Sequence, residues 1–371
     1  MNFGFTEEQE FLRNTARELL AAECPMTRVR ELLDDPAGYA PDLWQRMAQL
    51  GWLGLLVPES LGGSGLGMVE LVVVLEELGR ALTPSPFFAN LLGTLALLRA
   101  GSDTQQKDLL PAVARGEHVL SLAVTEAPAS EDPEVLQASA TQHGADYRLR
   151  GTKLFVPDGQ NADSLIVLAR TGGPGAFSLL RVEATDPGVE RVALQSIDQT
   201  RRLAEVHFDD ARAELLGPEH GGWDAWQWLR DRALVALAAE ALGGTEKVLE
   251  DAVAYAKQRV QFGKPIGVHQ AIKHKCADML IAVESCKSIT YWAAWSAAEE
   301  TDDAPLAAAM AKAYTSDAYR ECSAENIQIH GGVGFTWEYD CHLYYKRAKA
   351  LEVTFGDASL HRERVASLLG L

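Results

Sequence analysis

The stretch YAKQRVQFGKPIGVHQ, residues 255–270, lies between two alanine-rich segments with helical spacing. Its Gly-Lys-Pro corner ends the first helical pattern, and Gln270 stands where the second begins. The guanidinium of Arg259 has a planar fork that can bind a phosphate through two hydrogen bonds. The ring of Phe262 offers a flat face, and the glycine after it lets a ligand approach the backbone closely. The stretch fits either a solvated basic turn between helices or a site for a pyrophosphate and a ring.

A second stretch, NIQIHGGVGFT at residues 326–336, ends another predicted helix at a pair of glycines. Gln328 lies in the last turn of that helix, and Gly332 is the second glycine of the pair. A glycine after a helix is common as a C-terminal cap, but a glycine pair also leaves room for a ligand against bare backbone. Alone, this stretch leaves both interpretations open.

The sequence on both sides of these two stretches divides into three predicted parts. Residues 1–120 have helical spacing, including a capping box formed by Thr6 and Gln9. Residues 121–218 contain short strand-like segments separated by Gly, Pro and Asp, which is typical of a small β-barrel or sandwich. Residues 219–371 contain long helices joined by short loops, as in an antiparallel bundle. The predicted fold class is therefore mostly α with a middle β-domain. The predicted strands are 147–149, 165–169, 177–182 and 204–208, and the predicted bundle helices are 226–258, 270–299, 305–329 and 341–350.

Composition limits the classes of function. The chain has 371 residues, 47% of them hydrophobic, which is enough for more than one packed core. Its formal charge of −18 opposes nonspecific binding to nucleic acid or an anionic membrane, because both need a basic surface. No apolar run approaches the roughly 18 residues that span a bilayer. The acidic first ten residues, MNFGFTEEQE, lack the layout of a signal peptide, and we expect a soluble cytoplasmic protein.

Cysteine and histidine show no arrangement typical of metal binding. The five cysteines form no Cys-x-x-Cys pair, and the histidines form no His-Glu-x-x-His motif. We therefore expect neither a disulfide framework nor a metal site.

Five segments together resemble the acyl-CoA dehydrogenase family, and the resemblance covers the whole chain. They lie in the family's order, from its first helix to its most specific C-terminal patterns. The segments are FTEEQEFLRNTAREL (5–19), LVPE (56–59), Thr125-Glu126 of a Thr-Glu-Pro-type segment, RVQFGKPI (259–266) with Gln270, and QIHGGVGFT (328–336).

The resemblance implies a helical N-terminal domain, a middle β-domain and a C-terminal four-helix bundle, in dimers or tetramers. It implies FAD as cofactor, with Thr125 and Phe155 beside the chain's own flavin. The residues implied to reach the cofactor of a neighbouring subunit are Arg259, Phe262, Gln270, Gln328 and Gly332. The implied reaction is α,β-dehydrogenation of an acyl-CoA: a base takes the α-proton, a hydride passes to FAD, and electrons leave to an electron-transferring flavoprotein.

The chain departs from the family at the catalytic base. The usual base is a glutamate in a Tyr-Glu-Gly-Thr turn at a fixed distance after the glycine pair, and Phe355 occupies that position here. Arg362 and Ala366 fall on a downstream Arg and Ala of the family, so the register is fixed from both sides. Some members carry the glutamate on the first bundle helix instead, where this chain has Ala233. Both positions therefore lack a base.

The middle domain departs as well. Where the family has a Trp-Ile-Ser/Thr strand that covers the flavin and donates a hydrogen bond, this chain has Phe155-Val156-Pro157. Phe155 can still cover a ring, but proline has neither a hydroxyl nor an N–H to donate. Residues implied to serve a neighbour's FAD are thus intact, whereas those serving the chain's own site are partly lost. This asymmetry predicts a hetero-oligomer in which a homologous subunit supplies the base.

Two alternatives remain open. The first is a self-sufficient homo-oligomer with a relocated base, for which Asp357 is nearest, although Asp357 also fits an N-cap of the last helix. Glu352 and Glu240 are further candidates that also fit solvated or paired carboxylates. The second alternative is a non-catalytic acyl-CoA-binding or structural relative, against which the intact basic turn speaks.

Overall fold

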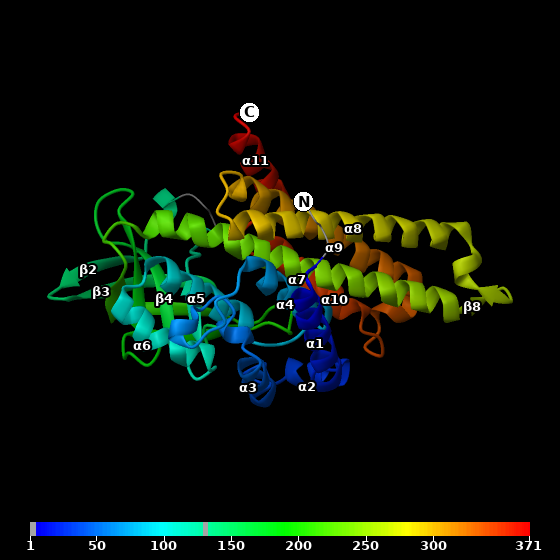
Figure 1. Cartoon of the computed structure of the whole chain (residues 1–371), viewed down its shortest axis with the longest axis horizontal. Coiled ribbons are helices and arrows are strands. Elements are labelled where there is room, and N and C mark those ends of the chain that lie inside the picture. The colour runs from blue at the N-terminus through cyan, green and yellow to red at the C-terminus, as the bar shows by residue number, and fades with distance from the viewer. Residues whose placement is uncertain (1–4, 129–132) are drawn as a thin grey trace. The chain divides into compact units, whose positions relative to one another are not determined.

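The computed structural model describes residues 5–128 and 133–371, and Figure 1 shows the chain coloured along its sequence. The chain forms two compact units. The first, the bundle unit, contains the residues up to Glu31, Met68–Thr83 and Asp231–Leu371. The second, the barrel unit, contains Leu32–Gly67 and Pro84–Arg230. Because these units follow packing and not chain order, the predicted domain boundaries at residues 120 and 218 stay a prediction.

A β-sheet closed on itself forms the centre of the barrel unit. Neighbouring strands follow the order β1–β4–β2–β3–β7–β5, and β5 also pairs antiparallel with β4, which closes the ring. The predicted β-domain is therefore a barrel and not an open sandwich. The strands are β1 (Leu120–Ala123), β2 (Ser139–His143), β3 (Asp146–Pro157), β4 (Ser164–Arg170), β5 (Phe177–Glu183), β6 (Val189–Leu194, paired with β7) and β7 (Leu203–Leu216).

Alternation along the strands fills the barrel. Ala204, Val206 and Phe208 of β7 are all buried, because every second side chain of a strand points to the same face. Helices of the same unit cover the barrel, and α5 lies on β1. A Cβ atom at Gly93 of α5 would overlap the side chain of Leu120, so glycine permits this close approach. The helical segments of the unit are α3 (Pro41–Gln49), α5 (Phe87–Ala100), α6 (Asp103–Ala114), η1 (Trp52–Gly54), η2 (Glu59–Leu61) and η3 (Pro133–Val135).

Long helices make up the bundle unit, and Figure 1 shows α8 and α9 running alongside each other. The four predicted bundle helices correspond to α7–α10 within a few residues at each end. The Thr6–Gln9 capping box at the start of α1 is also confirmed. The helices are α1 (Glu7–Glu23), α2 (Met26–Leu33), α4 (Met68–Arg80), α7 (Gly222–Gln258, from residue 231 onward), α8 (Gln270–Ala298), α9 (Ala304–His330), α10 (Cys341–Val353) and α11 (Ala358–Leu368).

Glycines bring α4 and α7 into backbone contact. A Cβ at Gly79 of α4 would overlap the carbonyl of Glu240, and a Cβ at Gly243 of α7 would overlap the carbonyl of Glu76. The two helices therefore approach each other more closely than side chains would allow. In the part of the chain that the structure describes, no helix is long and apolar enough to cross a membrane.

Candidate functional site

The stretch that joins α7 to α8 forms a short β-hairpin. The Arg259 N–H donates to the Tyr255 carbonyl at 2.8 Å and completes the last turn of α7. Strands β8 (Val260–Gln261) and β9 (Lys264–Pro265) then pair antiparallel, followed by η4 (Ile266–Val268). Phe262 lies at the tip, where its side chain is 93% exposed. The hairpin thus presents a guanidinium and an aromatic ring to the outside of the bundle unit.

The glycine pair after α9 is equally open. Gln328 and Gly332 are exposed, and a short 3-10 segment, η5 (Gly331–Phe335), begins at the pair. A Cβ atom at either Gly331 or Gly332 would meet nothing within 4 Å. There is therefore free space against this backbone, as a bound ligand would require.

A ring stack brings these two stretches together. The ring of Tyr255, in the last turn of α7, stacks on that of His330 at the end of α9, with centroids 4.0 Å apart and planes 25° apart. Lys275 of α8 forms an ion pair with Glu325 of α9. Two stretches that are about 70 positions apart in sequence thus meet at one end of the bundle unit, and Gln270 stands beside them at the start of α8.

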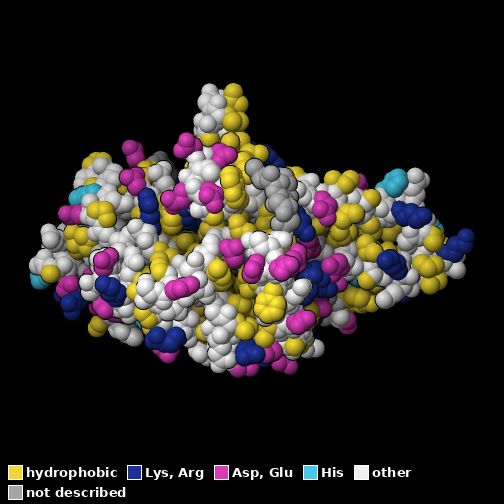
Figure 2. Space-filling model, in the orientation of Figure 1, with side chains coloured by type: hydrophobic (Ala, Val, Ile, Leu, Met, Phe, Trp, Pro, Cys, Tyr) yellow, Lys and Arg dark blue, Asp and Glu magenta, His cyan; other side chains and the backbone are white. Residues whose placement is uncertain are grey.

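This end of the bundle unit is basic although the chain as a whole is acidic. Lys and Arg side chains gather over β8 at the right of Figure 2. The exposed cations of this segment are Lys257, Arg259, Lys264 and Lys273. Their donors, together with the side-chain amides of Gln270 and Gln328, suit a pyrophosphate, which offers only acceptors. The donor set present in the chain therefore fits the phosphate part of FAD.

The two predicted flavin residues of the barrel unit are also adjacent. The Leu154 N–H donates to the Thr125 carbonyl at 2.8 Å, which places Thr125 beside the end of β3 and next to Phe155. Lys153 Nζ donates to the Val124 carbonyl at 3.0 Å and to Glu126 Oε1 at 2.6 Å. Because Lys153 is fully buried, its pKa is lowered. The buried ion pair of Lys153 and Glu126 therefore fixes the two residues next to Thr125, which are Val124 and Glu126 itself.

Backbone strain occurs at three of the phenylalanines discussed above, and also at residues away from them such as Leu82 and Glu300. Phe155, Phe262 and Phe355 have φ angles of 53°, 53° and 54°. A bulky residue with such a φ is a steric outlier, and such outliers cluster at active and binding sites. Sequence patterns give no indication of this strain, which the structure adds to the motif evidence.

The turn that carries Phe355 joins α10 to α11. Lys312 of α9 donates from below it to the carbonyls of Glu352 at 3.0 Å and Gly356 at 2.9 Å. His361 Nε2 lies 2.8 Å from the Phe355 carbonyl oxygen. The sequence reasoning missed both side chains. The one available indication was a lysine inside the apolar stretch LAAAMAKAYT of residues 306–315.

The alternative bases have structural partners. Asp357 is the N-cap of α11, and its Oδ1 accepts from the Leu360 N–H at 2.9 Å, so the predicted cap is confirmed. Glu352 forms ion pairs with Lys349 and Arg320.

Two further positions considered for the catalytic base, Glu240 and Ala233, lie on α7. The carboxylate of Glu240 lies 3.4 Å from Arg347, so it is paired, as one of the two interpretations predicted. Ala233, at the other position where the family can carry its base, is fully buried. Among the residues that the structure describes, no cluster of His, Cys, Asp or Glu could hold a metal ion.

Comparisons with known proteins agree with this geometry. Family models described as acyl-CoA dehydrogenase N-terminal, middle and C-terminal domains match residues 6–117, 121–211 and 220–369. Acyl-CoA dehydrogenase IpdE2 of Mycobacterium tuberculosis (strain ATCC 25618 / H37Rv) is 34% identical over 347 residues, covering 92% of this chain and 91% of that protein.

Two similar solved structures extend the comparison. A variant of the Tcur3481-Tcur3483 steroid ACAD superposes with a TM-score of 0.89 at 32% identity and covers 98% of each chain. The ChsE4-ChsE5 complex from Mycobacterium tuberculosis has a TM-score of 0.91 at 30% identity, covering 100% of this chain and 99% of that chain. This chain belongs to the acyl-CoA dehydrogenase family.

Proposed function

We propose that this FAD-dependent acyl-CoA dehydrogenase works as one subunit of a heteromer, and that a homologous partner supplies the catalytic base. The observation that carries the proposal is the combination of an intact, basic β8–β9 hairpin with Phe355 on the turn where the family places its glutamate. Phenylalanine cannot accept a proton. The chain thus keeps the hairpin residues that would bind a neighbour's FAD, but it lacks the base that would remove the α-proton at its own site.

Each group of residues has a distinct task under this proposal. Bound FAD supplies the hydride acceptor. Arg259 and Gln270 bind the phosphates of the neighbour's cofactor, and Phe262 packs against its flat part. The open backbone at Gly332 lets that cofactor lie close to the end of α9.

The barrel unit supports a weaker flavin site of the chain's own. Phe155 has an exposed ring that can cover a flavin. Pro157, however, has no N–H, and its carbonyl accepts from Ser121 Oγ at 2.5 Å. The hydrogen bond that the family's Ser or Thr donates to the flavin therefore has no donor at this position.

Dehydrogenation needs a base, because general-base help at the weakly acidic α-carbon is worth about 10²–10⁴-fold in rate. The carboxylate nearest in sequence to Phe355, that of Asp357, is engaged as a helix cap. Glu352 and Glu240 are engaged in ion pairs. Because all three carboxylates already have partners, a base supplied by a second chain is favoured over a relocated base in this chain.

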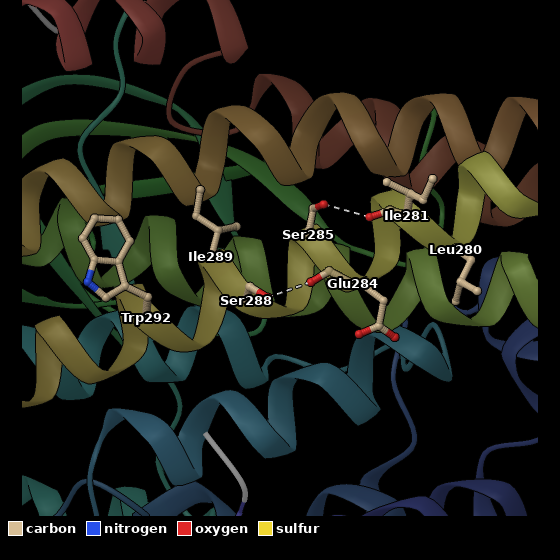
Figure 3. A pocket seen from close by; sticks show the side chains of 7 residues that line it. All are labelled: Leu280, Ile281, Glu284, Ser285, Ser288, Ile289 and Trp292. Carbon is tan, nitrogen blue, oxygen red and sulfur yellow. Dashed lines mark hydrogen bonds between the residues drawn. The ribbon is translucent and has the colours of Figure 1, made fainter. Parts of the chain in front are cut away.

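The outer face of α8 suits a subunit interface. Leu280, Ile281, Ile289 and Trp292 line a groove of about 730 Å³, and Figure 3 shows them along one side of the helix. Between them, the hydroxyls of Ser285 and Ser288 donate to carbonyls one turn earlier in α8. The face is mostly apolar, its two hydroxyls are bonded within the helix, and the exposed carboxylate of Glu284 is its one charged group. Apolar patches with polar groups among them are typical of protein-binding surfaces. This face lies on the helix that follows the hairpin.

The similar proteins narrow the expected substrate and partners. ChsE4-ChsE5 is a complex, and the Tcur3481-Tcur3483 protein is a steroid ACAD. We therefore propose a bulky, steroid-derived acyl-CoA as the substrate class, and an electron-transferring flavoprotein as the acceptor of electrons.

The test is the flavin content, mass in solution and activity of the chain purified alone and after co-expression with a base-bearing homologue. We expect the chain alone to bind FAD poorly and to be inactive, and the co-expressed complex to be yellow and active. A homo-oligomer with about one FAD per chain and a kcat on the order of 1–10³ s⁻¹ would refute the heteromer. In that case Asp357→Asn would show whether Asp357 is the base.

A further inference from the structure

A buried lysine lies beneath the turn that carries Phe355. Lys312 is on α9 and is 1% exposed. Its Nζ donates to Ser316 Oγ at 3.0 Å, to the Glu352 carbonyl at 3.0 Å and to the Gly356 carbonyl at 2.9 Å. All three protons of the ammonium are used, and all three acceptors are uncharged oxygens.

The same turn is held from its other side. His361 of α11 is fully buried, and its Nε2 lies 2.8 Å from the Phe355 carbonyl oxygen. Thr354 Oγ1 donates to the Ala350 carbonyl at 2.8 Å, and the Gly356 N–H donates to the Val353 carbonyl at 3.3 Å. The carbonyls of three of the five residues 352–356 are therefore bonded to side chains of α9 or α11.

We propose that Lys312, together with His361, is a positioning residue that fixes the turn Val353–Asp357 and thereby sets the direction of the side chain at position 355. The inference rests on the proposed function for one point only, namely that position 355 faces the acyl-CoA. Because the turn is fixed, the residue type at position 355 decides whether this subunit can remove the α-proton: a glutamate can accept it, and a phenylalanine cannot.

Two observations support positioning over simple packing. First, Phe355 is held at a φ of 54°, which a phenylalanine adopts only where the surroundings impose it. Second, an ammonium without a carboxylate on any of its three hydrogen bonds is costly to bury, and an apolar side chain would fill the same space at less cost. Lys312 therefore fits a role that apolar packing cannot fill, which is to hold the turn's carbonyls.

The charge of Lys312 is sensitive to pH. Burial lowers its pKa to about 7, although Glu352, Asp357 and Asp317 favour the ammonium. A neutral amine has one donor fewer, so after deprotonation it can donate to both carbonyls only if the Ser316 hydroxyl becomes the donor of the third bond. Three carboxylates act on Lys312, those of Glu352, Asp357 and Asp317. Glu352 pairs with Lys349 and Arg320, and Asp317 pairs with Arg320 and Arg362. His361 contacts the same turn from α11.

The first test observes the turn directly. We would place 4-fluorophenylalanine at position 355 and record its ¹⁹F resonance in the otherwise native chain, in Lys312→Met and in Lys349→Met. Lys349 is the matched control, because it pairs with the carboxylate of Glu352 and not with the carbonyls of the turn. We expect one narrow resonance in the native chain and in the control, and a broadened or split one in Lys312→Met. The native resonance should shift with a midpoint near pH 7, and this shift should vanish in Lys312→Met.

An unchanged ¹⁹F spectrum in Lys312→Met would overturn the inference. Should Lys312→Met fail to fold, His361→Ala removes the other contact, and a native-like resonance in that variant would overturn it equally.

The second test separates this inference from the proposed function. With FAD added in excess until this chain's own flavin site is filled, Phe355→Glu is expected to give the chain acyl-CoA-dependent flavin bleaching. Under the same conditions, Phe355→Glu with Lys312→Met is expected to lose about 10²-fold of that rate with little change in KM. If Phe355→Glu is inactive although its own flavin site is filled, and the native chain shows a narrow ¹⁹F resonance, the proposed facing of position 355 is refuted and the fixed turn is left intact. Equal rates with and without Lys312 would refute the positioning role alone.

Discussion

At the scale of single residues, backbone strain and buried charge occur together. Phe155 and Phe355 both have a positive φ, and each has a buried lysine nearby. Lys312 donates to the carbonyl of Gly356, the residue after Phe355, whereas Lys153, two residues before Phe155, donates to the carbonyl of Val124. Lys153 has a carboxylate partner in Glu126, whereas the three bonds of Lys312 end on neutral oxygens. A buried lysine can fix a loop more firmly than apolar packing, because each of its hydrogen bonds holds one particular backbone oxygen in place.

A third buried charge affects stability with pH. Glu76 of α4 is buried and accepts from Tyr291 Oη at 2.5 Å, while Arg13 lies 3.6 Å away. Burial, with the nearby Glu246 carboxylate, raises the pKa of Glu76 to about 7. Between its ordinary value of 4.5 and about 7, the folded chain therefore binds more protons here than the unfolded chain. The stability that this group contributes is complete below pH 4.5 and is lost as the pH rises through about 7.

We therefore expect Glu76→Gln to flatten the loss of stability between pH 5 and pH 8, by about 2–3 kcal/mol at most. An amide keeps an acceptor for Tyr291 but does not ionise. Urea denaturation at a series of pH values measures the effect, with the exposed Glu31→Gln as control. A pH profile in Glu76→Gln that parallels the native one would contradict the assignment.

At the scale of elements, local chemistry decided which predictions succeeded. The capping residues Thr6 and Asp357 and the Gly-Lys-Pro corner are signals within a few residues, and the structure confirms the helix ends they predict. The pairing of β3 with β7 joins strands far apart in the sequence, and no local pattern encodes it, whereas β4 and β5 form a hairpin across residues 171–176. The Tyr255–His330 stack and the contacts of Lys312 are likewise long-range, so the sequence indicated the motifs but not how they meet.

The contact of α4 with α7 allows a direct test of such long-range packing. A Cβ at Gly243 would overlap the Glu76 carbonyl, which belongs to helix backbone and cannot rotate away. We expect Gly243→Ala to force the helices apart and to lower the free energy of unfolding by about 1–3 kcal/mol or more. Gly173→Ala is the control, because a Cβ there meets nothing within 4 Å, and its effect should stay within about 0.5 kcal/mol. Equal denaturation midpoints for the two variants would show that the helices adjust freely.

At the scale of the whole molecule, charge is unevenly distributed. The chain carries −18 overall, yet exposed cations gather over the β8–β9 hairpin (Figure 2). A general acidic field repels a polyanion, so a local basic group is needed to hold one. The same hairpin carries an aromatic ring that is almost wholly exposed, and the mostly apolar face at Leu280–Trp292 lies further along α8, the helix that follows it. Exposed phosphate donors beside an exposed apolar helix face suit a cofactor site that a second subunit completes.

The last prediction therefore concerns the cofactor that, under the proposed function, this chain shares with its neighbour. We expect Arg259→Ala to weaken FAD binding by the assembled enzyme about 10–100-fold, because a hydrogen bond to a charged group is worth about 1.5–3 kcal/mol. Lys107→Ala, which removes an exposed cation of α6 outside the hairpin, is the control and should change binding far less. The ratio of flavin to protein after gel filtration, and the fluorescence of released FAD on titration, measure the difference. In a heteromer, the flavin lost through Arg259→Ala belongs to the partner's site, so adding unaltered chain to a flavin-depleted partner should restore it. Full flavin retention in Arg259→Ala would mean that the hairpin serves the interface alone and that the phosphates are held elsewhere.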